Sequence, residues 1–144
     1  MYKALLLSLF LVQPLAPPVE LFEPAPIPVV RQKMGEVEYV QQYAKVLFDD
    51  YELEYILPDG RRVDVLTSRY AYEVDWSTKY CEGLGQSLSY AVATNRNPGL
   101  ILLMKGADDE RYNQCLGVIT HLRSRGYNFH FIAINVESGK IWNH

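Results

Sequence analysis

The stretch that decides the fold is Arg61–Asp75, which reads RRVDVLTSRYAYEVD. Apolar and polar residues alternate on either side of Thr67-Ser68-Arg69, a pattern typical of two half-buried strands joined by a tight turn. Three carboxylates, those of Asp64, Glu73 and Asp75, lie within these strands. Asp is depleted in strands, and a buried carboxylate has to be paired, protonated or bound to a cation. The stretch therefore predicts an antiparallel hairpin whose acids converge on a metal ion.

A helix and a further strand are expected before this hairpin. Between Glu36 and Phe48, apolar residues recur at helical spacing and acids occupy the first turn, where the helix dipole favours them. The expected buried stripe is Val37, Val40, Ala44 and Leu47. Residues 51–57 alternate like a strand, and Pro58-Asp59-Gly60 has the chemistry of a turn. The first half of the chain thus predicts a helix followed by a three-strand meander.

The second half predicts two helices and two strands. Helical spacing runs from about Ser77 to Ala93, and Asn95–Gly99 ends it. Leu100–Met104 is a continuous apolar run, as expected for a central strand buried on both faces. Asp108–Arg125 predicts a helix and residues 129–136 a last strand. The expected buried stripe of that helix is Tyr112, Cys115, Leu116, Ile119 and Leu122. The fold class is α/β: a three-layer-like sandwich whose mixed sheet is antiparallel at first and parallel after the crossover.

Strand and helix geometry indicates which polar side chains meet. Residues two apart in a strand share a face, so Glu73 and Asp75 point the same way, and Asp64 on the neighbouring strand faces them if the register allows. In the helix that follows, each residue turns by about 100°, so Lys79, Gly83, Gln86 and Tyr90 form one stripe. That stripe brings an amine, an amide and a phenol toward the acids. Together these features predict a divalent-metal phosphodiesterase site.

Composition describes one ordinary globular domain. The 144 residues are 49% hydrophobic and 22% charged, with a net charge of −3. This balance excludes a protein that coats nucleic acid through overall positive charge, so any such contact has to come from a local basic patch. Arg61, Arg62 and Arg69, with Arg96, are the cations nearest the acids in the sequence. Arg61 and Arg62 are equally well explained as charges that protect a sheet edge.

The amino-terminal residues differ from the rest. Lys3 precedes the apolar run 4–12, which is the layout of a secretory signal over residues 1–16. The run is shorter than the roughly 20 residues of a permanent membrane span, so none is expected in the mature protein. Prolines in residues 17–34 favour an extended linker, and the folded domain is expected at residues 35–144. A working signal implies export to the periplasm or beyond; the alternative is a tail on a cytoplasmic protein.

Cysteine and histidine suggest no metal site. Cys81 and Cys115 lack the spacing of zinc ligands and allow at most one disulfide, with buried free thiols the favoured alternative. His121, His130 and His144 have no ligand spacing either.

The ordered set of motifs resembles the PD-(D/E)xK nuclease superfamily, particularly its RecB-type branch. Residues 58–64 (PDGRRVD), 71–76 (AYEVDW) and 82–91 (EGLGQSLSYA) also resemble a group of small bacterial proteins that carry signal peptides. The resemblance covers about residues 38–136. It implies a restriction-endonuclease-like fold and a deoxyribonuclease that hydrolyses phosphodiester bonds with Mg²⁺ or Mn²⁺.

The resemblance also implies roles for single residues. Asp64 and Glu73 match the metal-binding acids, Glu38 the first-helix acid, and Gln86 with Tyr90 the helix motif that orients substrate. Glu38 is equally well explained as a helix first-turn acid.

Asp75 stands where the family usually has a lysine, which leaves two interpretations. Either Lys79 supplies the ammonium from the helix, or Asp75 is a third acid ligand of a site that binds a cation without cutting. A small metal-dependent nuclease and a nuclease-fold binding module therefore both remain open, as does the oligomeric state.

Overall fold

The computed structural model describes residues 35–144. The predicted secretory signal and proline-rich linker lie outside the described residues. The elements in chain order are α1 (Glu36–Leu47), β1 (Glu52–Ile56), β2 (Arg62–Leu66), β3 (Tyr70–Trp76), the 3-10 turn η1 (Ser77–Lys79), α2 (Tyr80–Thr94), β4 (Asn97–Met104), α3 (Asp109–Ser124), β5 (His130–Asn135) and β6 (Ile141–Asn143). The predicted α/β class and element order are confirmed, with β6 added.

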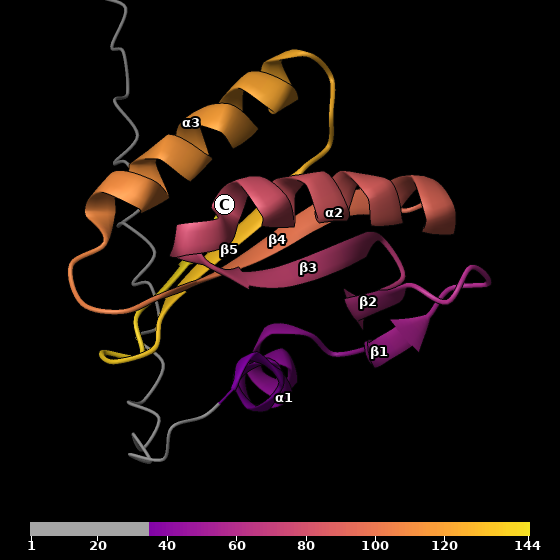
Figure 1. Cartoon of the computed structure of the whole chain (residues 1–144), viewed down its shortest axis with the longest axis horizontal. Helices are drawn as coiled ribbons and strands as arrows, with labels where there is room; N and C mark the ends of the chain where they lie inside the picture. The colour runs from indigo at the N-terminus through magenta and orange to yellow at the C-terminus, as the bar shows by residue number, and fades with distance from the viewer. Residues whose placement is uncertain (1–34) are drawn as a thin grey trace, which may run out of the picture.

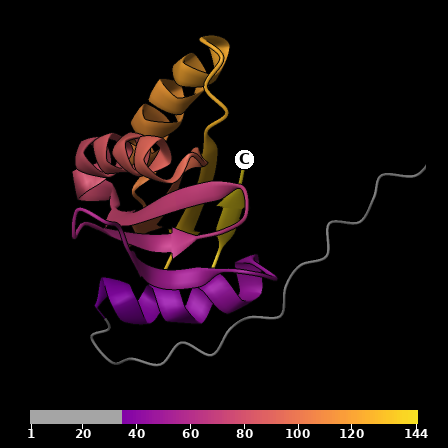
Figure 2. The ribbon, with the colours of Figure 1, turned by 90° about the vertical axis from the view of Figure 1, so that its right-hand side faces the viewer.

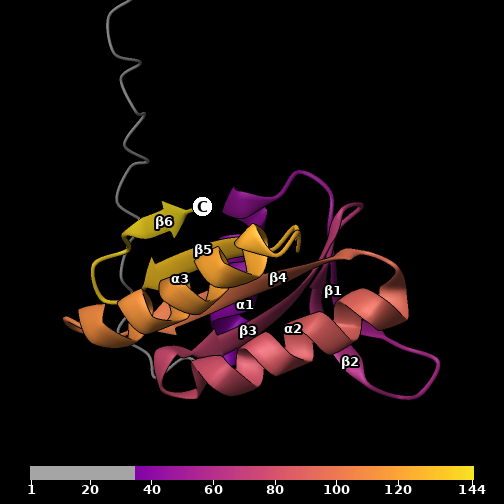
Figure 3. The ribbon, with the colours of Figure 1, turned by 90° about the horizontal axis from the view of Figure 1, so that it is seen from above.

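The strands of the described residues form one mixed open sheet of six strands between two helical layers (Figure 1). Their order in the sheet follows the chain. The meander β1–β2–β3 is antiparallel, β3–β4 and β4–β5 are parallel, and β6 is antiparallel to β5. Both parallel crossovers advance in the same direction, and such connections are right-handed. For this reason α2 and α3 lie over the same face (Figure 3), while α1 covers the other (Figure 2).

Two apolar layers hold the helices to the sheet. On the α1 side, Val40 and Tyr43 pack with Tyr72 and Ile101; on the other side, Ile119 of α3 packs over Leu100. After Asn97 every residue of β4 is buried, which confirms the prediction of a central strand covered on both faces. Within residues 35–144, no helix combines the length and apolar character required to cross a bilayer.

The stretch Asn95–Gly99, predicted to end the helix, also contains the first residues of β4. Asn95 ends α2 in the left-handed conformation, and β4 begins two residues later. Pro98 is tolerated there because β4 pairs with β5 only from Gly99 onward, so no ladder bond to β5 is lost. A Cβ on Gly99 would lie 2.3 Å from the Tyr72 ring. The motif that looks like a helix stop is therefore also a strand start fitted to an aromatic side chain.

Several predicted core positions are more exposed than expected. Val37 is 44% exposed because α1 docks through Val40, Tyr43 and Ala44 instead. Of the expected α3 stripe, only Cys115 and Ile119 are fully buried. Both cysteines are free, and Cys81 is exposed. Each helix contacts the sheet over a narrower stripe than its sequence period suggests.

Gly83 lets α2 approach the sheet closely. A Cβ there would lie 2.9 Å from Cδ1 of Leu100 and 3.2 Å from Cβ of Asp75, whereas a Cβ on Gly85 would meet nothing within 4 Å. Both glycines lie inside the same helix. They therefore form a matched pair that separates helix propensity from packing.

We expect Gly85→Ala to raise the free energy of unfolding by about 1 kcal/mol, the helix-propensity gain. Gly83→Ala has the same gain but crowds Leu100 and Asp75, and overpacking costs about 1–3 kcal/mol. Its free energy of unfolding should therefore lie at least about 1 kcal/mol below that of Gly85→Ala. Urea denaturation of the two variants measures this difference, and equal stabilisation would contradict the close approach of α2.

Candidate functional site

Asp64 and Glu73 form the centre of the candidate site. Regular pairing of β2 with β3 covers Leu66–Ala71 and Val65–Tyr72, and the same register continued by one residue places Asp64 opposite Glu73. At this point a side chain takes the place of a backbone acceptor on the neighbouring strand: the Val74 N–H of β3 donates to Oδ2 of Asp64 at 2.8 Å. The expected meeting of these two acids is thus present.

Glu73 is buried without a partner for one of its oxygens. It is 8% exposed, and among the described residues its Oε2 is the one buried side-chain polar atom with no hydrogen bond. Burial raises the pKa of Glu73 to about 9, and the negative charges of Asp64 and Asp75 add to this. Burial also raises the pKa of Asp64, against the lowering effect of the Val74 hydrogen bond. Two ionised carboxylates only accept hydrogen bonds, so Oε2 requires a proton or a cation.

Asp75 lies two residues further along the same face. It is 5% exposed, and burial raises its pKa to about 6, while the Trp76 N–H, at 2.9 Å from Oδ1, and the ammonium of Lys79 lower it. Lys79 is exposed at the start of α2. The expected proximity of a helix-borne amine to these acids is therefore present, although Lys79 makes no ion pair at bonding distance among the described residues.

Two members of the predicted helix stripe, Gly83 and Tyr90, face the acids. Gly83 lies against Asp75, and Tyr90 is buried. Burial raises the pKa of Tyr90 to about 12, and the charges of Glu73 and Asp64 contribute, so its hydroxyl stays protonated and lies near both acids. Gln86 is half-buried, with Nε2 at 3.5 Å from Oε1 of Glu82.

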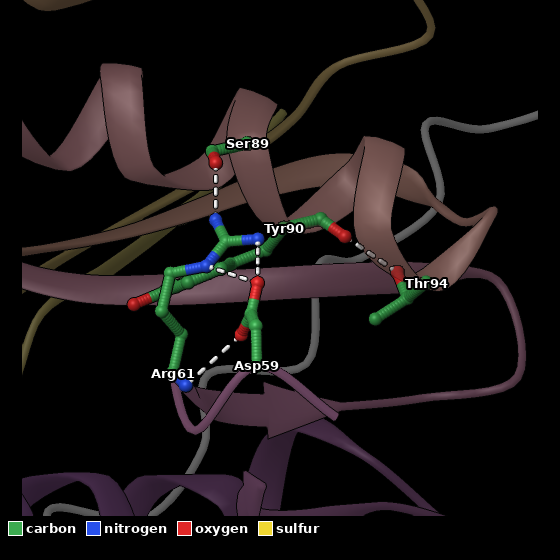
Figure 4. Close-up of polar contacts among 5 residues, drawn as sticks. All are labelled: Asp59, Arg61, Ser89, Tyr90 and Thr94. Atoms are coloured by element: carbon green, nitrogen blue, oxygen red, sulfur yellow. Dashed lines mark hydrogen bonds and ion pairs between the residues drawn. The ribbon is translucent and has the colours of Figure 1, made fainter. Parts of the chain in front are cut away.

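Arg61 is already engaged with other residues (Figure 4). Its Nε and Nη2 donate to Oδ2 of Asp59 at 2.8 and 2.6 Å, and its Nη1 donates to the Ser89 hydroxyl. The guanidinium carbon also lies 5.9 Å from the centre of the Tyr90 ring. Arg61 thus ties the β1–β2 turn to α2 and supports Tyr90, rather than standing free for a phosphate.

The other predicted substrate arginines are also occupied or distant. Arg62 makes an ion pair with Glu54 at 2.8 Å. Arg69 lies at the amino end of β3, with its guanidinium 5.6 Å from the centre of the Tyr70 ring. At about 3.3 Å per strand residue, it is roughly 13 Å along the strand from Glu73. The charge of Arg62 does reach Asp64, whose pKa it lowers, but its guanidinium is paired with Glu54.

Glu38 is not brought to the candidate site. It is exposed, and its carboxylate folds back toward Gly35 at the start of α1. Its half-buried neighbour Glu36 is the first-turn acid whose charge raises the pKa of both Glu73 and Asp75. The sequence could not distinguish the two, because the docking of α1 decides which first-turn acid faces the sheet.

β1 is irregular opposite Asp64. Glu54 has φ = 56°, in the left-handed region, although it lies within a strand. Leu53 and Val65 pack on the α1 side, whereas Tyr55 and Val63 pack in the cluster that contains Tyr90. Residues two apart in a regular strand share a face, so the facing reverses across Glu54 and Asp64. This irregularity sits beside the acid whose side chain replaces the ladder.

The acids partly fit a hard divalent cation. Among residues 35–144, no three His, Cys, Asp or Glu side chains are grouped as a metal site, so the structure does not gather Asp64, Glu73, Asp75 and Glu38 as ligands of one ion. Asp64 and Asp75 each direct one oxygen to a backbone N–H. What remains is the Asp64–Glu73 pair with one unpartnered oxygen. Mg²⁺ is commonly held by one or two carboxylates, with waters and substrate phosphates as the other ligands, so this pair fits it.

We expect Glu73→Gln to remove a pH dependence of stability. A folded-state pKa near 9, against an ordinary value of 4.5, means that the folded chain keeps a proton that the unfolded chain releases. Stability therefore falls as pH rises through this window, by at most about 1.4 kcal/mol per unit. Urea denaturation at about pH 5 and about pH 8 should show a decline that is smaller in Glu73→Gln by at least about 1 kcal/mol. Glu82→Gln, at an exposed position, should behave like wild type, and an unchanged decline in Glu73→Gln would contradict the burial.

Because Glu54 has a positive φ, we expect Asn to be tolerated better than Val at this position, the reverse of the usual preference in strands. Val favours regular strands but is strained at positive φ, whereas Asn tolerates it. Glu54→Val should lower the free energy of unfolding by about 1–2 kcal/mol, and Glu54→Asn should leave it unchanged or raise it. Glu52→Val, at a regularly paired position of the same strand, is the control and should cost nothing. A Glu54→Val protein as stable as Glu54→Asn would show that the strand is regular there.

No model of a known protein family, no curated protein and no solved structure matches this chain. What the protein does therefore has to follow from the chemistry of the acids and their surroundings.

Proposed function

We propose that the protein is a metal-dependent nuclease that hydrolyses phosphodiester bonds in DNA, on a restriction-endonuclease-like fold. The observation that carries the proposal is the buried Asp64–Glu73 pair, in which Oε2 of Glu73 has no partner. A core position that needed only packing would hold an apolar residue, since an uncompensated buried carboxylate is costly. The order of helix, meander, helix and strand, with Tyr90 of α2 near the acids, supports the superfamily resemblance.

In this proposal Asp64 and Glu73 hold Mg²⁺ or Mn²⁺. Bound there, the ion would polarise the phosphate and lower the pKa of a water. The chain's own residues supply the rest. The protonated hydroxyl of Tyr90 donates a hydrogen bond near the acids, and Lys79 brings positive charge to the same edge, where negative charge develops on the phosphate oxygens. Arg61, held by Asp59 and Ser89 as Figure 4 shows, lies against the Tyr90 ring and would help to orient it.

The second candidate is a nuclease-fold module that binds a cation or a partner without cutting. Asp75 favours it, because a buried acid replaces the strand lysine of the family and Lys79 makes no ion pair with the acids among the described residues. The two candidates differ in turnover, not in metal affinity.

We expect the wild-type protein to digest plasmid and single-stranded DNA with Mg²⁺ or Mn²⁺ and not with EDTA. Glu73→Gln and Asp64→Asn should reduce the rate to below about one hundredth, because each removes a carboxylate from the pair. Glu38→Gln is the matched control, because it changes an exposed acid outside the candidate site, and it should retain the wild-type rate.

Metal binding is measured separately by the melting temperature with and without Mn²⁺, since a ligand that binds only the folded state stabilises it. A Mn²⁺-dependent rise in wild type that is lost in Glu73→Gln, without any cleavage, supports the binding module and contradicts the nuclease. If the protein shows neither a rise in melting temperature nor cleavage, both the nuclease and a cation-binding module are contradicted.

A further inference from the structure

A hollow lies at the carboxyl ends of β3 and β4, beside the acids. It has a volume of about 490 Å³ and is lined by Trp76, Ser77, Thr78, Lys105, Ala107, Asp108 and Arg111. The chain leaves the sheet here twice, from β3 into η1 and from β4 toward α3 (Figure 1). In open α/β sheets the carboxyl ends of strands are where ligands commonly bind. None of these residues belongs to the acid pair described above.

Lys105 is one of the two cations in the lining of the hollow. Its ammonium lies 4.5 Å from the centre of the Trp76 ring, a distance at which the ring face attracts a cation. Among the side chains that the structure describes, Lys105 makes no ion pair. It is thus a positive charge held at the wall of a cavity.

The acid of the hollow is already satisfied. Asp108 is mostly buried; its Oδ1 accepts from Nη1 of Arg111 at 3.2 Å, and its Oδ2 accepts from the hydroxyl of Ser77. A guanidinium has five N–H donors, so Arg111 keeps others for a ligand. The lining therefore carries two cations against one paired carboxylate, which favours an anion as occupant.

The hollow and the acids share an edge of the sheet. Trp76 directly follows Asp75 on β3, and η1, which begins at Ser77 in the hollow, ends at Lys79 near Asp75. Trp76 lies three residues, about 10 Å, along β3 from Glu73, so a strand of nucleic acid with one phosphate at the acid pair would carry another of its phosphates, more than one step away, over this hollow. Cations beside a negatively charged centre would also offset its repulsion of a polyanion.

We propose that this hollow binds a backbone phosphate of a nucleic-acid strand, with Lys105 and Arg111 as the side chains that hold it. The inference rests on the proposed function for the identity of the strand, although binding itself requires no cleavage. It assigns phosphate binding to the carboxyl edge of β3 and β4 rather than to Arg61 and Arg62 on the β1–β2 hairpin, or to Arg69 at the opposite end of β3.

The test measures binding of a fluorescein-labelled oligothymidylate of about 12 nucleotides by fluorescence anisotropy. It is performed in EDTA on the Glu73→Gln background, so that no bond is cut. Lys105→Gln with Arg111→Gln should weaken binding at least about tenfold at low salt. The same double substitution should lower the salt slope by about 0.7 for each phosphate that the protein no longer neutralises. Lys105→Arg keeps the charge and should retain affinity. If the lysine had only a structural role, keeping the charge alone would not preserve binding.

Two control substitutions, tested singly and together, remove one arginine and one lysine charge elsewhere. The first control is Arg125→Gln. Arg125 lies just beyond the far end of α3, about 21 Å along the helix from Arg111. Lys45→Gln lies in the last turn of α1, on the other face of the sheet. Both should bind within about twofold of the background, because a distant exposed charge contributes little through screened solvent.

The outcomes separate this inference from the nuclease proposal. Weaker binding in the hollow variants alone, with a wild-type protein that never cuts, supports the hollow and contradicts the nuclease. Metal-dependent cleavage together with hollow variants that bind like the controls contradicts the hollow and leaves the nuclease. Equal weakening in hollow and control variants, or no binding by the background protein, overturns the inference. Circular dichroism melting checks that each variant is folded. If Lys105→Arg is folded but binds weakly, this result also contradicts a phosphate site.

Discussion

The burial of Glu73 next to Asp64 is the constraint on which the rest of the structure depends. Glu73 pairs in the sheet with Leu100, a residue of the apolar layer under α2 and α3. A carboxylate there lacks water, and Asp64 and Asp75 oppose its ionisation. An apolar side chain at this position would make a more stable protein. Retained destabilising groups of this kind are characteristic of sites under functional demand.

The surroundings of Glu73 are held by regular elements, which gives the acids a fixed geometry. Gly83 lets α2 lie against Asp75, and Tyr90 of the same helix packs with Val63 of β2. Arg61 then joins the hairpin to α2 through Ser89, as Figure 4 shows. Sites carried on strands and helices keep their geometry better than sites carried on loops. The fold therefore presents the acids without needing a loop to order first.

Sequence patterns predicted the features that depend on local period. Alternation located β2 and β3, the apolar run located β4, and helical spacing placed Gly83 and Tyr90 toward the strands. β6 was not predicted, because a strand of three residues, Ile141–Asn143, is too short to show a period. Its position depends on pairing with β5, a tertiary contact. The same limit applies to Glu54, whose positive φ no propensity scale indicates in a strand.

The meeting of Asp64 with Glu73 could be predicted from the sequence, whereas the partners of the nearby cations could not, for an electrostatic reason. Arg61 and Arg62 lie near the acids in sequence, but each has a nearer carboxylate, in Asp59 and Glu54. A surface arginine pairs with whichever acid the turn brings within reach. Its distance from a site along the sequence does not reveal which acid that is. Lys105 follows β4, which is adjacent to β3 only in the folded sheet. If the protein is the nuclease proposed above, ionised acids with so little compensating charge would repel a phosphodiester, and positive charge would have to come from a bound cation and from neighbouring strand ends. For that proposal, the carboxyl edge of β3 and β4, rather than the hairpin turn, is the side from which a polyanion would approach.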